Sequence, residues 1–541
     1  MNKKSVTTFL AITTAIGLVA CGSQSEKVDV SSSSSASASV ESTGNGESTG
    51  SSEQSKAAEL KGPGNVTLKR MGSNVSFDPN TDQNAQLLEQ VTGYKAEYTA
   101  LPAENADEKL AMEVAGGADY DVIRCSYSQF QTLMSQGALQ PIENELNAYG
   151  QDILKGVSEN AWKAVTGTDG HIYGIPYMHP YPTEILQSIA CRWDLMQAAG
   201  ITKMPETLSE FHDCLKTLKD YYGDKYIIFT GPYEVATSSV SDNWRFPKAV
   251  GNAFGIYNDW MTDDSGKVYY MLEDEHFKDM VDYLSELQKE GLIDPDWAVN
   301  TGTNVEEKFA GGRAIMAAST RPMMGTCLPT MQQTLGLSDD DIKFIGTLKG
   351  DDGTCKVMNS KAIESVSVVL KSSKNVADAI NWINIRQQNQ LYLNIGTEGE
   401  TFKYDEDGTI VPINPTFSDQ KANSWWYMDS SNEEEFAKEW PARVRKSEGQ
   451  WLAFSETSVW YSENEPEVFV ENPFTYVPAL EMYSKENPSL FNNINDFMMQ
   501  VLSGVKTSDD VDDLISEWKN SGGKEVKKEL QDWYDDFYQN N

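Results

Sequence analysis

Strand-like and helix-like segments alternate along the chain from residue 66, and this alternation limits the possible folds more than any other feature. Residues 66–72, VTLKRMG, have the pattern of a strand, and residues 81–93, TDQNAQLLEQVTG, have that of a helix that Gly93 closes. Residues 95–102, KAEYTALP, and then residues 121–124 continue the series of strands. Such alternation predicts βαβ units, a mainly parallel sheet and therefore an α/β fold.

Two later segments have the spacing of amphipathic helices. Thr207 and Glu210 form a capping box in front of apolar residues at positions 208, 211, 215 and 218. Residues 277–287 repeat this spacing, and Gly291 stands where a C-terminal cap is needed. The chain after residue 61, about 480 residues, is too long for one ordinary domain, so we expect two lobes.

The N-terminal segment has the order of an export signal that ends at a cysteine. Two lysines come first, and residues 6–20 are apolar or small but fall short of the roughly 18 to 20 residues of a membrane-spanning helix. LVAC at residues 18–21 resembles the bacterial lipobox, in which cleavage falls before the cysteine and lipid joins its thiol. We therefore predict a signal peptide at residues 1–20 and a lipid anchor at Cys21, on the extracellular face of the cell membrane. A plain secretory signal is the alternative.

The segment that follows has the composition of a flexible tether. Residues 21–61 are dominated by Ser, Gly, Ala, Thr and Glu, and contain almost nothing that forms a core. A flexible chain of this length spans roughly 35 Å, which lifts a folded body off a bilayer. GESTG at residues 46–50 matches the G-x-S-x-G motif of serine hydrolases, but the tether lacks the strand–turn–helix context that this motif needs.

Charge and cysteine usage exclude several classes of function. A net charge of −37, from 81 acidic and 44 basic side chains, repels phosphate backbones, so nucleic acid is not an expected partner. Five cysteines besides Cys21, without C-x-x-C spacing, do not suit a disulfide framework or a zinc site. The acidic runs at 263–266, 351–353 and 405–408 do not match a calcium loop and are predicted to be tight turns between strands. We expect no metal and no other cofactor.

Five segments of the chain, taken in order, are similar to those of a known family. They are GADYDVIRCSYSQFQTLMSQGALQPIENEL from residue 117, GHIYGIPY from 170, RWDLMQAAGITKMPETLSEFHDCLKTLKD from 192, LSELQKEGLIDPDW from 284 and FAGGRAIMAAS from 309. With them the chain resembles the extracellular solute-binding proteins of ABC importers, related to maltodextrin-binding protein and to the lipoproteins of Gram-positive bacteria that bind aldouronate or complex oligosaccharides.

The resemblance implies a two-lobed, periplasmic-binding-protein-like fold of type II, with the ligand in a cleft between two α/β lobes. It also implies a monomer whose lobes close on a hinge, and ABC transporter permease subunits that recognise the closed form. We place the first lobe at residues 62–182 and 341–405. The second lobe is expected at residues 183–340 and 406–541.

Loops that follow strand ends are the expected place for the ligand. A sugar ring needs a flat apolar platform for its C–H face and planar polar groups for its hydroxyls, and aromatic and amide side chains supply both. The candidates in loops after predicted strands are Tyr127, Gln129, Tyr177, His179 and Tyr181.

Further candidates come from the resemblance and from local pattern. Tyr233, in FTGPYEV, matches the place where maltodextrin-binding protein has EPY, whose Tyr contacts sugar, and Trp244 lies in the polar segment after it. The other candidates are Arg321, which follows the strand-like AIMAAST, and the pair Trp425 and Trp426 in SWWYMD. Where the maltodextrin binder has a Trp after DII, this chain has Cys125, which argues against maltodextrin itself.

Together these features predict a substrate-binding lipoprotein that captures a sugar, with an oligosaccharide as its ligand, and that has no enzymatic activity. Two alternatives stay open. One is a peptide-binding receptor on the same fold, and the other is a surface glycoside hydrolase, whose paired carboxylates are defined by their separation in space and not by sequence.

Overall fold

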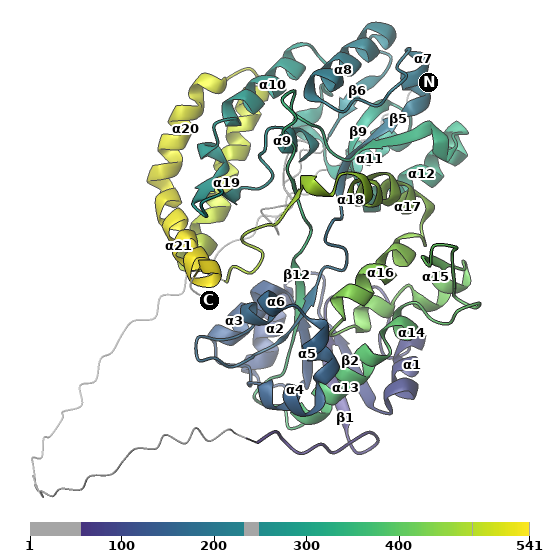
Figure 1. Cartoon of the computed structure of the whole chain (residues 1–541), viewed down its shortest axis with the longest axis vertical. Coiled ribbons are helices and arrows are strands. Elements are labelled where there is room, and N and C mark those ends of the chain that lie inside the picture. Colours follow the sequence, from purple (N-terminus) through teal and green to yellow (C-terminus); the bar gives the residue numbers. More distant parts are fainter. Residues whose placement is uncertain (1–55, 232–247, 479, 540–541) are drawn as a thin grey trace, which may run out of the picture. The chain divides into compact units, whose positions relative to one another are not determined.

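The predicted alternation of strands and helices is present at the start of the folded chain. It runs from β1 (Thr67–Gly72) through α1 (Gln83–Thr92) and β2 (Lys95–Ala100) to β3 (Val122–Cys125) (Figure 1). The structure is a computed structural model and describes residues 56–231, 248–478 and 480–539. These residues all belong to one compact unit of the chain.

Five strands form the first sheet, in the order β2-β1-β3-β12-β4. Its two later strands are β4 (Ile175–Met178) and β12 (Ile363–Val368). β1 is parallel to β2 and to β3, whereas β12 runs antiparallel to both β3 and β4.

Four strands form the second sheet, in the order β10-β5-β9-β6. They are β5 (Gln187–Arg192), β6 (Ile227–Thr230), β9 (Ala314–Thr320) and β10 (Ile342–Ile345). β5 is antiparallel to β10 and β9, and β6 is parallel to β9.

Both sheets are therefore mixed, because one strand in each runs against the others: β12 in the first sheet and β5 in the second. The remaining strands of each sheet run in the same direction, in agreement with the expected mainly parallel arrangement. The reversal of β12 and β5 follows from the way in which the chain passes between the sheets. It leaves the first sheet after β4 and enters the second at β5, then leaves the second after β10 and returns to the first at β12. β5 and β12 each enter their sheet at the edge where the neighbouring strands end. Each must therefore run in the direction opposite to its neighbours.

Helices flank both sheets. Between the strands of the first sheet lie α2 (Ala106–Ala115), α3 (Tyr127–Ser135), α4 (Glu143–Tyr149), α5 (Gln151–Gly156) and α6 (Glu159–Ala164), and after β12 come α13 (Val376–Gln388) and α14 (Gln390–Asn394). The helices between strands of the second sheet are α7 (Trp193–Ala198), α8 (Leu208–Tyr222), α9 (Lys248–Ala253), α10 (Phe277–Lys289), α11 (Gly302–Ala310) and α12 (Arg321–Leu335).

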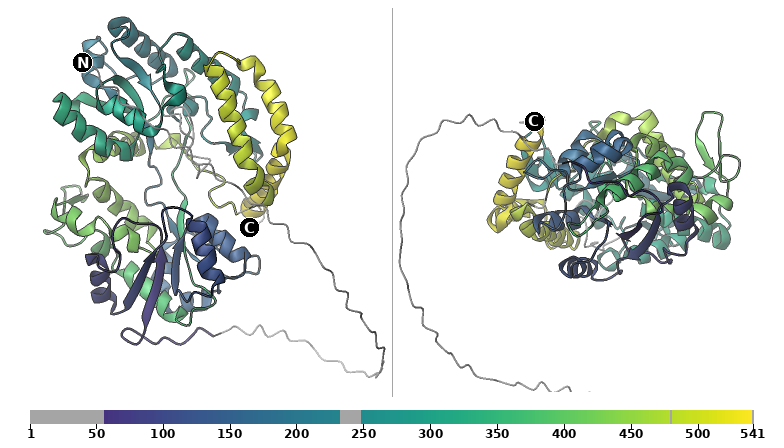
Figure 2. Two further views of the ribbon diagram at one scale, coloured as in Figure 1. Left: turned by 180° about the vertical axis from the view of Figure 1, so that it is seen from behind. Right: turned by 90° about the horizontal axis from the view of Figure 1, so that it is seen from below.

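The C-terminal part of the chain is mostly helical. Its helices are α15 (Thr416–Lys421), α16 (Glu433–Val444), α17 (Glu448–Phe454), α18 (Trp460–Asn464), α19 (Glu481–Leu502), α20 (Val511–Trp518) and α21 (Lys524–Tyr534). The last three, yellow in Figure 2, pack against one another. Paired short strands are β7 (Trp260–Thr262) with β8 (Val268–Tyr270), β11 (Val357–Met358) with β15 (Phe469–Val470), and β13 (Phe402–Tyr404) with β14 (Ile410–Pro412).

Local sequence signals account for the ends of two predicted helices. At α1, the Asp82 side chain accepts a hydrogen bond from the N–H of Asn84. Gly93 then adopts the left-handed conformation (φ 72°) and its N–H donates to the Glu89 carbonyl. At α8, the Thr207 side chain accepts a hydrogen bond from the Glu210 N–H, so the predicted N-terminus of this helix is confirmed.

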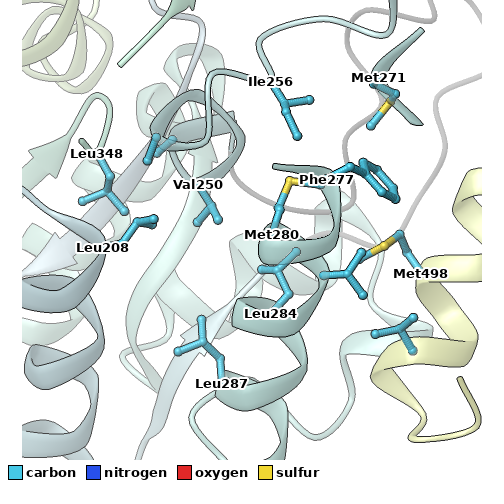
Figure 3. Packing of buried hydrophobic residues seen from close by; sticks show 14 of the residues in the cluster. Leu208, Val250, Ile256, Met271, Phe277, Met280, Leu284, Leu287, Leu348 and Met498 are labelled. Carbon is cyan, nitrogen blue, oxygen red and sulfur yellow. The ribbon is translucent and has the colours of Figure 1, made fainter. Parts of the chain in front are cut away.

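The predicted apolar stripe of α10 faces a hydrophobic core. Phe277, Met280, Val281, Leu284 and Leu287 are all buried. Figure 3 shows residues of α10 together with Leu208 and Met498, which come from other helices of the same core. Because burying a large apolar side chain stabilises a fold by about 1.5 to 3 kcal/mol, this stripe is enough to hold α10 in place.

The acidic runs form tight turns, as expected. Residues 263–266 connect β7 to β8, and residues 405–408 connect β13 to β14. Cys191 and Cys214 are buried, and burial raises the pKa of both thiols. Among the described helices, none combines the length and the apolar character that crossing a bilayer requires.

Two contacts bear on the expected lobe boundaries. β10 pairs with β5 in the second sheet, although residues 341–405 were expected in the first lobe. Trp426 and Tyr427 pack in the same core as Leu68 of β1, although residues 406–541 were expected in the second lobe. The division into lobes stays a prediction, and these contacts would move two of its boundaries.

Candidate functional site

The segments that connect the two sheets lie side by side. The N–H of His179 donates to the Ala362 carbonyl (2.8 Å), and the N–H of Ser360 donates to the Pro182 carbonyl (2.7 Å). The Ser360 hydroxyl donates to the Tyr181 carbonyl (2.7 Å). β15 adds a third segment, since it pairs in parallel with β11.

The strand ends of both sheets meet these connecting segments. In the first sheet, Met178 at the end of β4 pairs with Ile363 at the start of β12. In the second sheet, Thr320 at the end of β9 pairs with Gln187 at the start of β5. Ligands of α/β proteins bind beyond the carboxyl ends of strands, so this region is the place to search for a site.

A cavity of about 240 Å³ lies against the connecting segments. Its lining comes from both connections, namely His179, residues 184–187 and residues 357–362, together with Asn472 and with Lys248 and Asn252 of α9. Amide, hydroxyl and ammonium groups from separate parts of the chain converge here, which is the arrangement of a binding site for a polar ligand.

A buried carboxylate, Glu184, lies on one side of this cavity. Its side chain has no exposed surface, and it accepts hydrogen bonds from Arg321 Nε and from Trp440 Nε1, the latter at 3.0 Å. His179 Nε2 lies 3.4 Å from the same carboxylate. The guanidinium of Arg321 also donates to Gln450. Arg321, a predicted ligand-binding residue, is therefore committed to an ion pair in this structure.

Of the predicted site residues, the structure brings His179 to the cavity. Tyr177 is buried against Phe436 and Met428, and the guanidinium carbon of Arg124 lies 4.3 Å from the centroid of its ring. Tyr181 packs edge-on against Phe454, with ring centroids 4.9 Å apart. Neither tyrosine is among the residues that line the cavity.

Tyr127 and Gln129 lie at the start of α3, away from the cavity lining. The Tyr127 hydroxyl donates to the carbonyls of Ala164 and Tyr476, each at 3.2 Å, and burial raises its pKa to about 12. Gln129 completes a capping box with Ser126. Both predicted residues therefore have structural roles here.

The two adjacent tryptophans differ in their surroundings. Trp426 belongs to the core of the first sheet, where its Nε1 donates to the Ser73 carbonyl (2.9 Å) and the guanidinium carbon of Arg70 lies 4.3 Å from its ring. Trp425 is half-buried and packs at the edge of the same core. The structure places neither at the cavity. Tyr233, Trp244 and Cys21 lie outside the described residues.

Sequence reasoning missed several lining residues, among them Lys248, Asn252, Asn359, Lys361 and Asn472. The candidates came from loops after strand ends, from the resemblance and from an aromatic cluster, whereas Asn359 and Lys361 precede the strand β12. The signal was available in NSKA at residues 359–362, a short polar run between two apolar segments.

A family model described as bacterial extracellular solute-binding protein matches residues 78–384, more than half of the chain. Lipoprotein LipO of Bacillus subtilis (strain 168) is 24% identical over 494 residues, which cover 86% of this chain and 92% of that protein. The polygalacturonan/rhamnogalacturonan-binding protein YtcQ of the same strain is 22% identical over 518 residues, covering 89% and 94%.

The fold has a match among solved structures. The substrate-binding protein FusA of an ABC transporter from Streptococcus pneumoniae, in complex with kestose, aligns with a TM-score of 0.60 at 18% identity. The alignment covers 88% of this chain and 100% of that one. The two mixed sheets therefore form the periplasmic-binding-protein-like fold.

Proposed function

Since the chain belongs to the bacterial extracellular solute-binding protein family, and is therefore a binding protein of an ABC transporter and not an enzyme, we propose that its ligand is an oligosaccharide. The cavity between the connecting segments is the observation that carries this proposal. Its amide and hydroxyl groups suit the hydroxyls of a sugar. In support, FusA is described in complex with kestose, and YtcQ as a binder of polygalacturonan and rhamnogalacturonan.

The connecting segments suit a hinge. The first runs from β4 to β5 and the second from β10 to β12, and apart from the two-residue strand β11 neither contains a helix or strand. They link two sheets that have separate cores. A ligand in the cavity touches both connections and α9, so it stabilises the arrangement in which these parts are close together. To move the population from 1:99 to 99:1, the ligand must favour the closed form by about 5.5 kcal/mol. The permease subunits then recognise the closed form.

The proposal includes a lipid anchor at Cys21 on the extracellular face of the membrane. The lipobox-like LVAC and the tether of residues 21–61 support it, as does the similarity to a protein named lipoprotein LipO. Lipid with two or more chains holds a protein stably at a bilayer, whereas one chain alone is marginal.

A thermal-shift screen tests the proposed ligand class. The full-length protein is heated with neutral and acidic oligosaccharides, amino acids and short peptides. A ligand at 100 times its Kd adds about 2.7 kcal/mol of stability, which is a measurable rise in Tm. Stabilisation by oligosaccharides is the expected result, and stabilisation by peptides alone would replace the sugar proposal with the peptide-binding alternative.

A further inference from the structure

Two lysines line the cavity, although the whole chain has a net charge of −37. Lys248 and Lys361 both line the cavity, and Glu184 is the one carboxylate among its described lining residues. That carboxylate is already paired with Arg321, so its charge is balanced inside the protein. Lys248 also interacts with another residue, so its charge is not counted as free.

Lys361 differs from Lys248 and Glu184 in its surroundings. Its side chain is half-buried, and within residues 56–231, 248–478 and 480–539 it forms no ion pair. Its backbone is held on both sides, because its N–H donates to Asn359 Oδ1 (3.3 Å) and its carbonyl accepts from the Thr475 hydroxyl (3.1 Å). The backbone of Lys361 is thus fixed at the cavity, and its side chain forms no ion pair with any of the described residues.

We propose that the cavity selects oligosaccharides that carry a carboxylate, and that Lys361 binds that carboxylate directly. This inference rests on the proposed function and names its ligand class. A charge-assisted hydrogen bond is roughly twice as strong as a neutral one, and partial burial strengthens it further.

The neutral groups of the lining complete the site. Asn252, Asn359 and Asn472 supply amides, and Ser360 supplies a hydroxyl. These groups suit the ring hydroxyls of a sugar, while a single ammonium suits a single carboxylate. A neutral sugar of the same size satisfies the amides but leaves the charge of Lys361 unpaired.

The test compares acidic sugars with matched neutral ones by calorimetric titration of the full-length protein in detergent. Trigalacturonate is paired with its methyl ester, and sialyllactose with lactose, so that two sources of the carboxylate are separated. We expect at least one acid to bind at least about tenfold more tightly than its neutral partner, and its affinity to fall as salt is added. Lys361→Met should remove this preference.

Lys403→Met is the matched control, since Lys403 is exposed on β13 and does not line the cavity. It changes the net charge by the same amount and should keep the preference. Equal or tighter binding of neutral sugars, or a preference that survives Lys361→Met, would overturn the charge inference and leave the proposed function intact. If no sugar of either kind binds in this titration or in the wider thermal-shift screen, both the charge inference and the proposed function are contradicted.

Discussion

Arg70 Nη2 lies 2.9 Å from Asp429 Oδ1, and neither side chain has any exposed surface. Arg386 pairs with the same carboxylate. These contacts join β1, α13 and the segment after residue 427, although Arg70 and Asp429 are 359 residues apart in the sequence. They fix the beginning of the C-terminal region on the first sheet.

Replacing Asp429 by Asn should be strongly destabilising. Burial alone raises the pKa of this carboxyl, but the guanidinium groups of Arg386 and Arg70 outweigh it and lower the pKa to about 2. Without the carboxylate, two buried cations lose their counterion, so we expect a loss of about 3 to 5 kcal/mol in unfolding free energy. Urea titration measures it. Asp419→Asn, at an exposed position, is the control, and an equal effect of both changes would contradict the role of the pair.

Glu439 should make stability depend on pH. Burial raises its pKa to about 7 from 4.5, although Asn394 and Gln390 donate hydrogen bonds to it. Between these values the folded protein holds a proton that the unfolded chain has released, so the unfolding free energy falls as pH rises. We expect Glu439→Gln to be more stable than the natural protein by about 3 kcal/mol at pH 8, with little difference at pH 4.5.

Denaturant titrations at the two pH values measure this difference. Glu434→Gln, on the exposed side of the same helix, is the matched control and should leave the pH dependence unchanged. If Glu439→Gln were as pH-dependent as the natural protein, the carboxyl would not be titrating between 4.5 and 7.

Arg321 and Glu184 should behave as a structural pair. Arg321→Met leaves a buried carboxylate without its cation, and we expect it to cost about 3 to 5 kcal/mol of unfolding free energy. Adding Glu184→Gln to this variant should restore part of the loss, because the unpaired charge is gone while the hydrogen bond from Trp440 is kept. A double-mutant cycle in urea gives the coupling energy. Additive effects of the two changes on the unfolding free energy would show that the side chains act independently. If Arg321→Met instead left the stability unaltered but abolished ligand binding, Arg321 would be a ligand-binding residue.

Lipidation at Cys21 is tested by Cys21→Ser. The change removes the thiol to which lipid attaches, so we expect the protein to leave the membrane fraction. Radiolabelled palmitate should label the natural protein and not the variant. Cys355→Ser, which keeps Cys21, should remain labelled and membrane-bound. Membrane retention and labelling of Cys21→Ser would contradict the anchor.

Local patterns predicted the parts of the fold that are determined locally. The ends of α1 and the buried face of α8 follow from caps and apolar spacing that the sequence displays directly. The antiparallel strands β5 and β12 were missed, because their direction depends on the chain passing between the sheets. The position of Asp429 was missed for the same reason, since nothing near it in the sequence indicates a partner in β1.

The candidate site shows the same limit. His179 was found because it follows a strand, as the expected ligand-binding loops do. Lys361 was missed because it precedes a strand, and its importance depends on the approach of α9 and Asn472 from elsewhere in the chain. Trp426 was a candidate ligand-binding residue, but Arg70 and Tyr98 pack against it in the core of the first sheet.

The most direct measurement is equilibrium binding followed by chemical analysis of the ligand. The full-length protein is titrated with oligosaccharides, and the bound sugar is then released and examined by mass spectrometry. A solute-binding protein of this family should bind one oligosaccharide per chain and return it with unchanged mass. Cleaved sugar, or no binding to any oligosaccharide at millimolar concentration, would contradict the proposed capture of an oligosaccharide for transport.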